Sequence, residues 1–268
     1  VGAPTAEYQN RSGTTHADML KLAESYQLPW HSHLQIFEQC RTSGIKYCAS
    51  VFCRESLEFY VDNFSPEFIK IASGELTNKI LLEAAGRAGL PIILSTGMAT
   101  PGELDDALHC LFTNGLQQSN LTLMACISSY PAFFRDYSFN LINWAKVRHP
   151  LISLAISDHT DSDCLGVTGA IMNFRYLEKH FTYDRQATGP DHSMSLNPSR
   201  LGEYCQNVQH AANLSQSVDS EVSHEPNIVF GGVEQELRIK ARRGAIASRN
   251  IQKGEIITEH DLSFKRPA

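Results

Sequence analysis

The sequence has no pair of cysteines at CxxC spacing, although it contains seven cysteines in all. An odd number of cysteines without that spacing argues against a disulfide framework and against a structural zinc knuckle. No apolar run approaches the roughly 18 residues of a membrane-spanning helix, and the N-terminus lacks the basic flank and apolar stretch of a secretory signal. We therefore expect a cytoplasmic protein that neither spans a membrane nor is secreted by that route.

Positive charge is also scarce, because 23 Lys and Arg stand against 29 Asp and Glu, giving a formal net charge of -6. This balance argues against a nucleic acid as the main partner, since such partners require clustered basic residues. There is no internal repeat and no low-complexity tract. What remains is an ordinary globular composition, 42% hydrophobic over 268 residues, which suffices for one barrel of about 250 residues or for a medium domain with a small appendage.

Short apolar runs rich in β-formers alternate along the chain with amphipathic stretches of helical length. This alternation is typical of parallel strands joined by crossover helices. Gly89 and Pro91 fit it, because glycine favours the end of a helix and proline cannot continue one. The predicted strands are 46–52, 68–72, 91–96, 121–127, 151–157 and 175–181, and the predicted helices include 56–64, 79–88, 101–111 and 165–173. Residues 206–223 are polar and weakly helical, and a small β-unit with a Lys-Gly turn is expected from residue 242 onward.

Polar residues gather where the predicted strands end. In parallel sheets and barrels, the carboxyl ends of the strands and the loops after them carry the chemistry. His159 and His180 end consecutive strands and could converge on one ion, and imidazoles completed by oxygen donors suit Mn²⁺ or Mg²⁺. Such an ion would act as a Lewis acid on a sugar aldehyde. The alternative is that each histidine only forms a hydrogen bond across a loop.

A second group at the same edge offers one cation and several hydroxyls, which could hold a phosphate and a carboxylate together. Its members are Lys70, Ser73, Ser95, Ser128 and Ser157. The alternative is that the group binds no ligand, so that the serines are ordinary loop residues and the lysine is exposed to solvent. Glu75 could serve as a general acid or base, or could simply be an acid that favours the first turn of a helix. Asp191 could hold a sugar hydroxyl, or could be a turn aspartate.

Six ordered segments together resemble the NeuB family of sialic-acid synthases, which includes legionaminic and pseudaminic relatives. They are KIASGELTN (70–78), PIILSTGMAT (91–100), CISSYPA (126–132), SDHT (157–160), EKHFTYDR (178–185) and GPDHSMSLNP (189–198). The segment RNIQKGEIITEHDLSFKRP (249–267) is similar to the opening of the SAF, or antifreeze-like, domain that follows the barrel in this family. The resemblance implies a (β/α)8 TIM barrel, with six of its eight βα units in this chain, over residues 1–224. A linker (225–241) and a partial SAF domain (242–268) would follow.

The resemblance also implies an activity and a set of site residues. The activity is condensation of phosphoenolpyruvate with N-acetylmannosamine or a related 2-acetamido sugar, giving a nonulosonic acid and phosphate on a divalent metal. His159 and His180 match the metal ligands, and Lys70 and Glu75 match the catalytic residues. The matching substrate-binding residues are Ser50, Ser73, Ser95, Ser128, Tyr130, Ser157, Asp191 and Arg266. The family further implies a homodimer in which the SAF domains are exchanged between subunits.

The sequence departs from the family pattern at its beginning. The N-H-x-G and K-x-Q patterns of the first two family strands do not occur, and the SAF segment stops just after Arg266. We therefore expect an incomplete copy of a synthase, truncated at both ends. An open six-stranded barrel would expose two strand edges. The alternatives are a catalytically inactive sugar-phosphate or metal-binding homologue, and an unrelated aldolase-like barrel, which would leave the SAF-like segment unexplained.

Overall fold

The structure is a computed structural model that describes residues 19–128, 132–189, 191–221, 240 and 243–265. The chain divides into two compact units, Val1–Ser220 and Glu221–Ala268. The larger unit contains the predicted strands and helices, and the smaller one contains a β-hairpin. No helix in the described ranges combines the length and the apolar character needed to cross a lipid bilayer.

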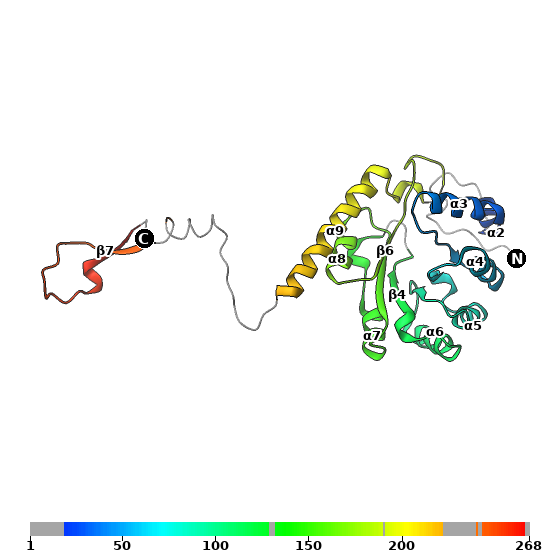
Figure 1. Cartoon of the computed structure of the whole chain (residues 1–268), viewed down its shortest axis with the longest axis horizontal. Helices are drawn as coiled ribbons and strands as arrows, with labels where there is room; N and C mark the ends of the chain where they lie inside the picture. Colours follow the sequence, from blue (N-terminus) through cyan, green and yellow to red (C-terminus); the bar gives the residue numbers. More distant parts are fainter. Residues whose placement is uncertain (1–18, 129–131, 190, 222–239, 241–242, 266–268) are drawn as a thin grey trace. The chain divides into compact units, whose positions relative to one another are not determined.

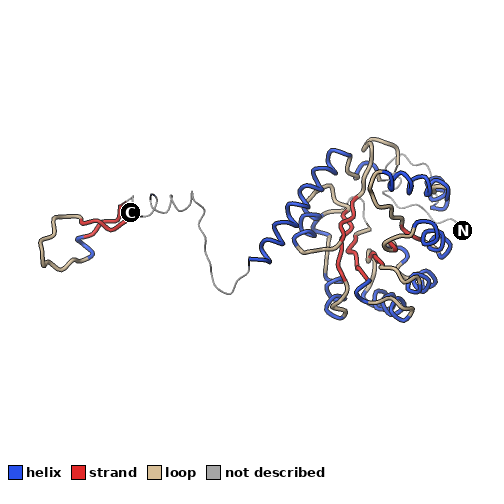
Figure 2. Tube along the Cα trace, in the orientation of Figure 1, coloured by secondary structure: helices blue, strands red, loops and turns tan. Residues whose placement is uncertain are grey.

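A six-stranded parallel sheet forms the centre of the larger unit, with its strands in the order in which they occur along the chain. Helices connect the strands and surround the sheet (Figures 1 and 2). The strands are β1 (Ser50–Val51), β2 (Ile69–Ile71), β3 (Ile92–Ser95), β4 (Leu121–Cys126), β5 (Ser153–Asp158) and β6 (Tyr176–Lys179). The α-helices are α2 (Met19–Tyr26), α3 (Trp30–Thr42), α4 (Arg54–Phe64), α5 (Lys79–Arg87), α6 (Pro101–Thr113), α7 (Asn140–Arg148), α8 (Cys164–Ile171) and α9 (Pro198–Glu221).

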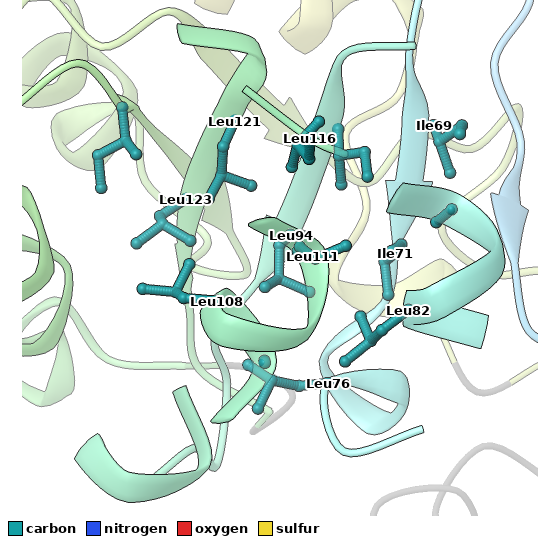
Figure 3. Close-up of a cluster of buried hydrophobic side chains, with 14 of the residues drawn as sticks. Ile69, Ile71, Leu76, Leu82, Leu94, Leu108, Leu111, Leu116, Leu121 and Leu123 are labelled. Carbon is teal, nitrogen blue, oxygen red and sulfur yellow. The ribbon is translucent and has the colours of Figure 1, made fainter. Parts of the chain in front are cut away.

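The main hydrophobic core lies between the sheet and its helices. Successive side chains of a strand point to opposite faces, so one set of alternating residues packs against the helices and the other faces the interior of the curved sheet. Ile71, Leu94 and Leu123 belong to the helix-facing set and are completely buried. Figure 3 shows them with Leu108 and Leu111 of α6 in one cluster. A smaller cluster of Ile93, Met124 and Ala155 lies on the interior face, so the two faces are distinguished by strand alternation alone.

Local sequence signals set several of the helix boundaries. Thr100 and Glu103 form a capping box at the start of α6, in which each side chain bonds the other residue's backbone N–H. The Asn78 side chain caps α5 by accepting a hydrogen bond from the backbone N–H of Leu81. Gly89, with φ of +70°, follows the end of α5 and leads the chain into β3. These signals fix where each strand starts, and therefore which residues reach its carboxyl end.

The sheet curves so strongly that β2 and β6, which are four strands apart, meet across its interior. The rings of Phe68, just before β2, and Tyr176 of β6 lie 5.3 Å apart, centroid to centroid. Within the described residues, β1 and β6 each pair with a neighbour on one side only. The fold is therefore a half-closed, TIM-barrel-like α/β arrangement, as predicted from the sequence.

The boundaries of the elements differ in places from the sequence predictions. The predicted first strand, 46–52, is reduced to Ser50–Val51, because the residues before it do not pair with β2. The polar segment 206–223 is predicted to be weakly helical, and its described residues, up to Glu221, do belong to a helix. That helix, α9, is longer than predicted, because it begins at Pro198 and has 24 residues. Two side chains of α9, those of Tyr204 and Ala211, are buried in the larger unit. Tertiary packing stabilises this helix, which its own sequence only weakly favours.

The smaller unit contains the predicted hairpin. Strands β7 (Gly244–Ala247) and β8 (Leu262–Lys265) pair in antiparallel fashion. Between them, the Glu255 N–H donates to the Gln252 carbonyl oxygen, and Gly254 has a φ of +94°. This is the Lys253-Gly254 turn expected from the sequence, since glycine adopts positive φ without steric cost.

Candidate active site

The buried cation of the candidate site is Lys70, on the interior face of β2. Only 7% of Lys70 is exposed, and its Nζ lies 3.1 Å from a carboxylate oxygen of Glu178 on β6. The interpretation of Lys70 as a solvated strand-end lysine is therefore wrong. Burial acts to raise the pKa of Glu178, but the Lys70 ammonium and a hydrogen bond from Ser157 outweigh it and hold this pKa below its ordinary value. The structure thus pairs a buried ammonium with a carboxylate that is ionised at neutral pH.

Three serines lie at or just after the carboxyl ends of β2, β3 and β4, at the same end of the sheet: Ser73, Ser95 and Ser128. The backbone N–H of Gly97 donates to Ser73 Oγ over 3.0 Å. A Cβ placed on Gly97 would lie 2.7 Å from Ser128 Oγ, so the absence of a side chain lets the two loops meet. Ser95 is 2% exposed, and its Oγ has no hydrogen-bond partner within the described part of the chain. A buried hydroxyl of this kind is available to a ligand oxygen.

Ser157 of β5 joins this group to the histidines. Its hydroxyl lies 2.7 Å from Glu178 Oε1 and 3.1 Å from His159 Nε2. Burial raises the pKa of Cys126, an effect offset in part by its hydrogen bonds with Ser73 and Ser157. Alternation along β4, β5 and β6 places Cys126, Ser157 and Glu178 on the same interior face.

The two predicted metal ligands lie side by side, with the ring centroids of His159 and His180 5.0 Å apart. His159 Nδ1 is 2.7 Å from the carbonyl oxygen of Ile127. Because a carbonyl only accepts, Nδ1 carries the proton and Nε2 carries the lone pair in the neutral ring. Burial lowers the pKa of His159, opposed by that hydrogen bond, so the neutral form is favoured. Nδ1 of His180 is 3.8 Å from Asp191 Oδ2.

These residues fit a divalent cation held in part by the protein. Neutral imidazole with its second nitrogen bonded to a carbonyl is the form that ligates metals. In the described ranges, no group of three or more His, Cys, Asp or Glu side chains is arranged around a common point. Two imidazoles would therefore leave most of the coordination sphere to water and substrate oxygens, which suits Mn²⁺ or Mg²⁺ better than a closed structural zinc site.

The remaining predicted residues have different positions. Ser50 is exposed on β1, in register with Lys70. Glu75 accepts a hydrogen bond from the Asn78 side chain at the start of α5, and among the described contacts nothing joins it to Lys70 or to the histidines. Tyr130 and Arg266 lie outside the described residues.

Sequence reasoning did not single out two residues that the structure places in the site. Glu178 could have been found, because it lies two positions before His180 on a strand and therefore shares its face. Tyr137 gave no such signal. Its hydroxyl donates to the Ser157 carbonyl oxygen over 2.8 Å and accepts from the His159 N–H over 2.9 Å. The Tyr137 side chain is thereby hydrogen-bonded to the backbone of the residues immediately before and after Asp158.

Comparison with known proteins gives the family of each unit. The model of the NeuB family matches residues 2–220, and the model of the SAF domain matches residues 242–268. N,N'-diacetyllegionaminic acid synthase of Campylobacter jejuni is 30% identical over 266 residues, covering 99% of this chain and 77% of that protein. Pseudaminic acid synthase of Helicobacter pylori is 30% identical over 257 residues, covering 93% and 71%.

Among solved structures, N-acetylneuraminic acid synthetase of Leptospira borgpetersenii is similar to this chain with a TM-score of 0.67 and 25% identity. The match covers 81% of this chain and 72% of that one. The motifs that carried the resemblance are thus matched by whole-chain similarity in sequence and in fold.

Proposed function

Because the chain belongs to the NeuB family, we propose that it is a synthase that condenses phosphoenolpyruvate with a 2-acetamido sugar of the N-acetylmannosamine type. The products would be a nonulosonic acid and inorganic phosphate. The names of the similar proteins, a legionaminic and a pseudaminic acid synthase, support this reaction class. The observation that carries the proposal is the series of contacts from the buried Lys70 through Glu178 and Ser157 to His159. The ring of His159 in turn lies 5.0 Å from that of His180.

Phosphoenolpyruvate would bind through its two anionic groups. Lys70 supplies the positive charge, and Ser73, Ser95 and Ser128 supply hydroxyls at neighbouring strand ends. The orphaned Ser95 Oγ would gain a partner when a ligand oxygen arrives. In the structure the Glu178 carboxylate is paired with the Lys70 ammonium. Bound phosphoenolpyruvate would compete with Glu178 for this ammonium, and Glu178 would then lie beside the substrate.

The sugar would lie between phosphoenolpyruvate and the histidines. When bound at His159 and His180, a divalent ion would supply Lewis acidity toward the sugar aldehyde. C3 of phosphoenolpyruvate would form the new bond to the aldehyde carbon, whose oxygen takes up a proton. Water adds at C2 with loss of a proton, and phosphate leaves by cleavage of the C–O bond. Holding both substrates in one orientation supplies much of the acceleration.

Proton transfer in this site is assigned to Glu178 in addition to the sequence candidate Glu75. Glu178 is ionised at neutral pH and contacts both Lys70 and Ser157, so it can accept a proton from the attacking water. Glu75 is engaged with Asn78. Asp191, whose Oδ2 lies 3.8 Å from His180 Nδ1, would bind a sugar hydroxyl. Tyr130 and Arg266 stay predictions from the sequence, as do the homodimer and the cytoplasmic location.

The test is release of phosphate from phosphoenolpyruvate by the chain, with Mn²⁺ and each candidate sugar in turn. We expect release only when sugar and Mn²⁺ are both present. His180→Ala should reduce the rate at least 100-fold, because one remaining imidazole would hold the ion weakly. His109→Ala, at an exposed position on α6, is the matched control and should retain the rate. Binding of phosphoenolpyruvate without turnover would instead support an inactive homologue, and retained turnover in His180→Ala would refute the metal assignment.

A further inference from the structure

A buried ion pair joins the ends of β5 and β6 on the side of the sheet opposite the candidate site. Asp158 Oδ2 lies 2.9 Å from Lys179 Nζ, and the two side chains are 0% and 4% exposed. Asp158 and Lys179 are register partners in the sheet. Neither residue faces the substrate side, so the proposed reaction gives them no direct part.

The same pair also holds the loop that follows β5. Lys179 Nζ donates to the carbonyl oxygens of Thr160 and Ser162, over 2.5 and 3.3 Å. Asp158 Oδ1 accepts from the N–H and the hydroxyl of Thr160, over 2.8 and 2.7 Å. The Tyr204 ring of α9 lies 5.6 Å from Lys179 Nζ. The chain on both sides of His159 is therefore fixed from the helix side of the sheet.

Stability alone does not account for a pair of this kind. Removing two charges from water costs several kcal/mol per ion, and well-packed apolar side chains of similar size are often as stabilising or more so. What an ion pair adds is a defined geometry. Here it defines the register of β5 against β6 at the last paired position.

That register decides where the two histidines point. His159 and His180 are the residues directly after Asp158 and Lys179, so strand alternation turns them to the interior face. A slip of one residue between strands would reverse the faces. With the register held, the two rings lie 5.0 Å apart, a separation from which both can reach one ion.

We propose that Asp158 and Lys179 are a positioning pair that holds His159 and His180 at the separation required for binding a divalent cation. This inference rests on the proposed function, which assigns the two histidines to the metal. It predicts that the pair controls metal affinity without touching the metal. It also predicts that phosphoenolpyruvate binding at β2 and β3 is largely independent of the pair.

The test is a titration of the full chain with Mn²⁺ in the absence of substrates. The concentration of free Mn²⁺ is measured by electron paramagnetic resonance. Lys179→Met keeps the length of the side chain and removes its charge. We expect its Kd for Mn²⁺ to rise at least ten-fold, with the Kd for phosphoenolpyruvate within about two-fold of wild type. Lys146→Met is the matched control, because Lys146 also donates to two backbone carbonyls, those of Pro150 and Ile152, but before β5 begins. Its Mn²⁺ affinity should not change.

A double variant, Asp158→Asn with Lys179→Met, keeps the test decisive if the single variant fails to fold. It contains no unpaired buried charge, so we expect it to fold and still to bind Mn²⁺ at least ten-fold more weakly. A folded double variant with wild-type Mn²⁺ affinity would overturn the inference. Failure of the wild-type chain itself to bind Mn²⁺ would be a different result, because it would overturn the metal assignment in the proposed function and this inference with it.

Discussion

Gly97 shows how a single residue sets the geometry of the candidate phosphoenolpyruvate site. Its backbone N–H bonds Ser73 Oγ, and the space above its Cα is occupied by hydroxyls from two loops. A Cβ there would lie 2.8 Å from Ser73 Oγ and 2.7 Å from Ser128 Oγ, closer than real Cβ contacts come. The hydroxyls of Ser73 and Ser128, which would hold an anion, can therefore both approach this position because Gly97 has no side chain.

We expect Gly97→Ala to raise the KM for phosphoenolpyruvate at least ten-fold, because both serines must move away from the new methyl group. Steady-state kinetics at saturating sugar would measure this. Gly102→Ala on α6 is the control, since nothing lies within 4 Å of a Cβ at that position, and it should leave the KM unchanged. An unchanged KM in Gly97→Ala would mean that these serines do not bind this substrate.

The hairpin of the smaller unit shows the same dependence on local contacts at the scale of an element. Asp261 accepts hydrogen bonds from the N–H and the hydroxyl of Thr258, over 2.8 and 2.9 Å, and from Arg249 Nε over 2.7 Å. The backbone hydrogen bond from Thr258, with the contacts to Arg249, lowers the pKa of Asp261 to about 2. One carboxylate thus ties the turn before β8 to the chain after β7.

A lowered pKa makes the stability of this hairpin depend on pH. The contribution of Asp261 is fully present above its unfolded pKa of 3.8 and is lost as the pH falls through about 2. We expect Asp261→Asn to reduce hydrogen-exchange protection of residues 244–265 in the full chain at pH 5. The difference between variant and wild type should disappear near pH 2. A difference that persists unchanged to pH 2 would contradict this assignment.

At the scale of the whole molecule, the larger unit is stabilised by one continuous cluster of buried residues from β1 to α8. Its members come from most of the βα units, so each unit contributes to the support of the others. Leu111 of α6 is completely buried in this cluster, as Figure 3 shows. The candidate site lies at the carboxyl ends of the same strands, so its geometry depends on a core that it does not contact.

Truncation of this core should therefore be costly. We expect Leu111→Ala to lower the free energy of unfolding of the larger unit by about 2–5 kcal/mol, from lost burial and the cavity left behind. Leu151→Ala, at a position that is 66% exposed, should change it by less than about 0.5 kcal/mol. Both free-energy changes would be measured by denaturant unfolding, with hydrogen exchange of peptides from residues 19–128 as the probe of unfolding. Equal effects of the two substitutions would contradict this description of the core.

The sequence by itself determined the order of the elements and the residues that reach the strand ends. Apolar runs, Gly89 and Pro91 are local signals, and they placed all six strands and four of the helices. The Asn78 and Thr100 caps that the structure shows are local in the same way. The positions of Lys70 and Ser157 at the ends of predicted strands then put both residues at one edge of the sheet. These features depend on neighbours within a few residues, which is why they can be predicted without coordinates.

Only the tertiary structure decided which of those residues meet. The contact of Lys70 with Glu178 joins strands that are four apart, and it exists because twist and curvature accumulate over the whole sheet. The bridge made by Tyr137 and the pair of Asp158 and Lys179 depend in the same way on how β5 and β6 end against their surroundings. No local pattern specifies these contacts, since each one joins residues that are brought together only when the sheet has curved and its helices have packed.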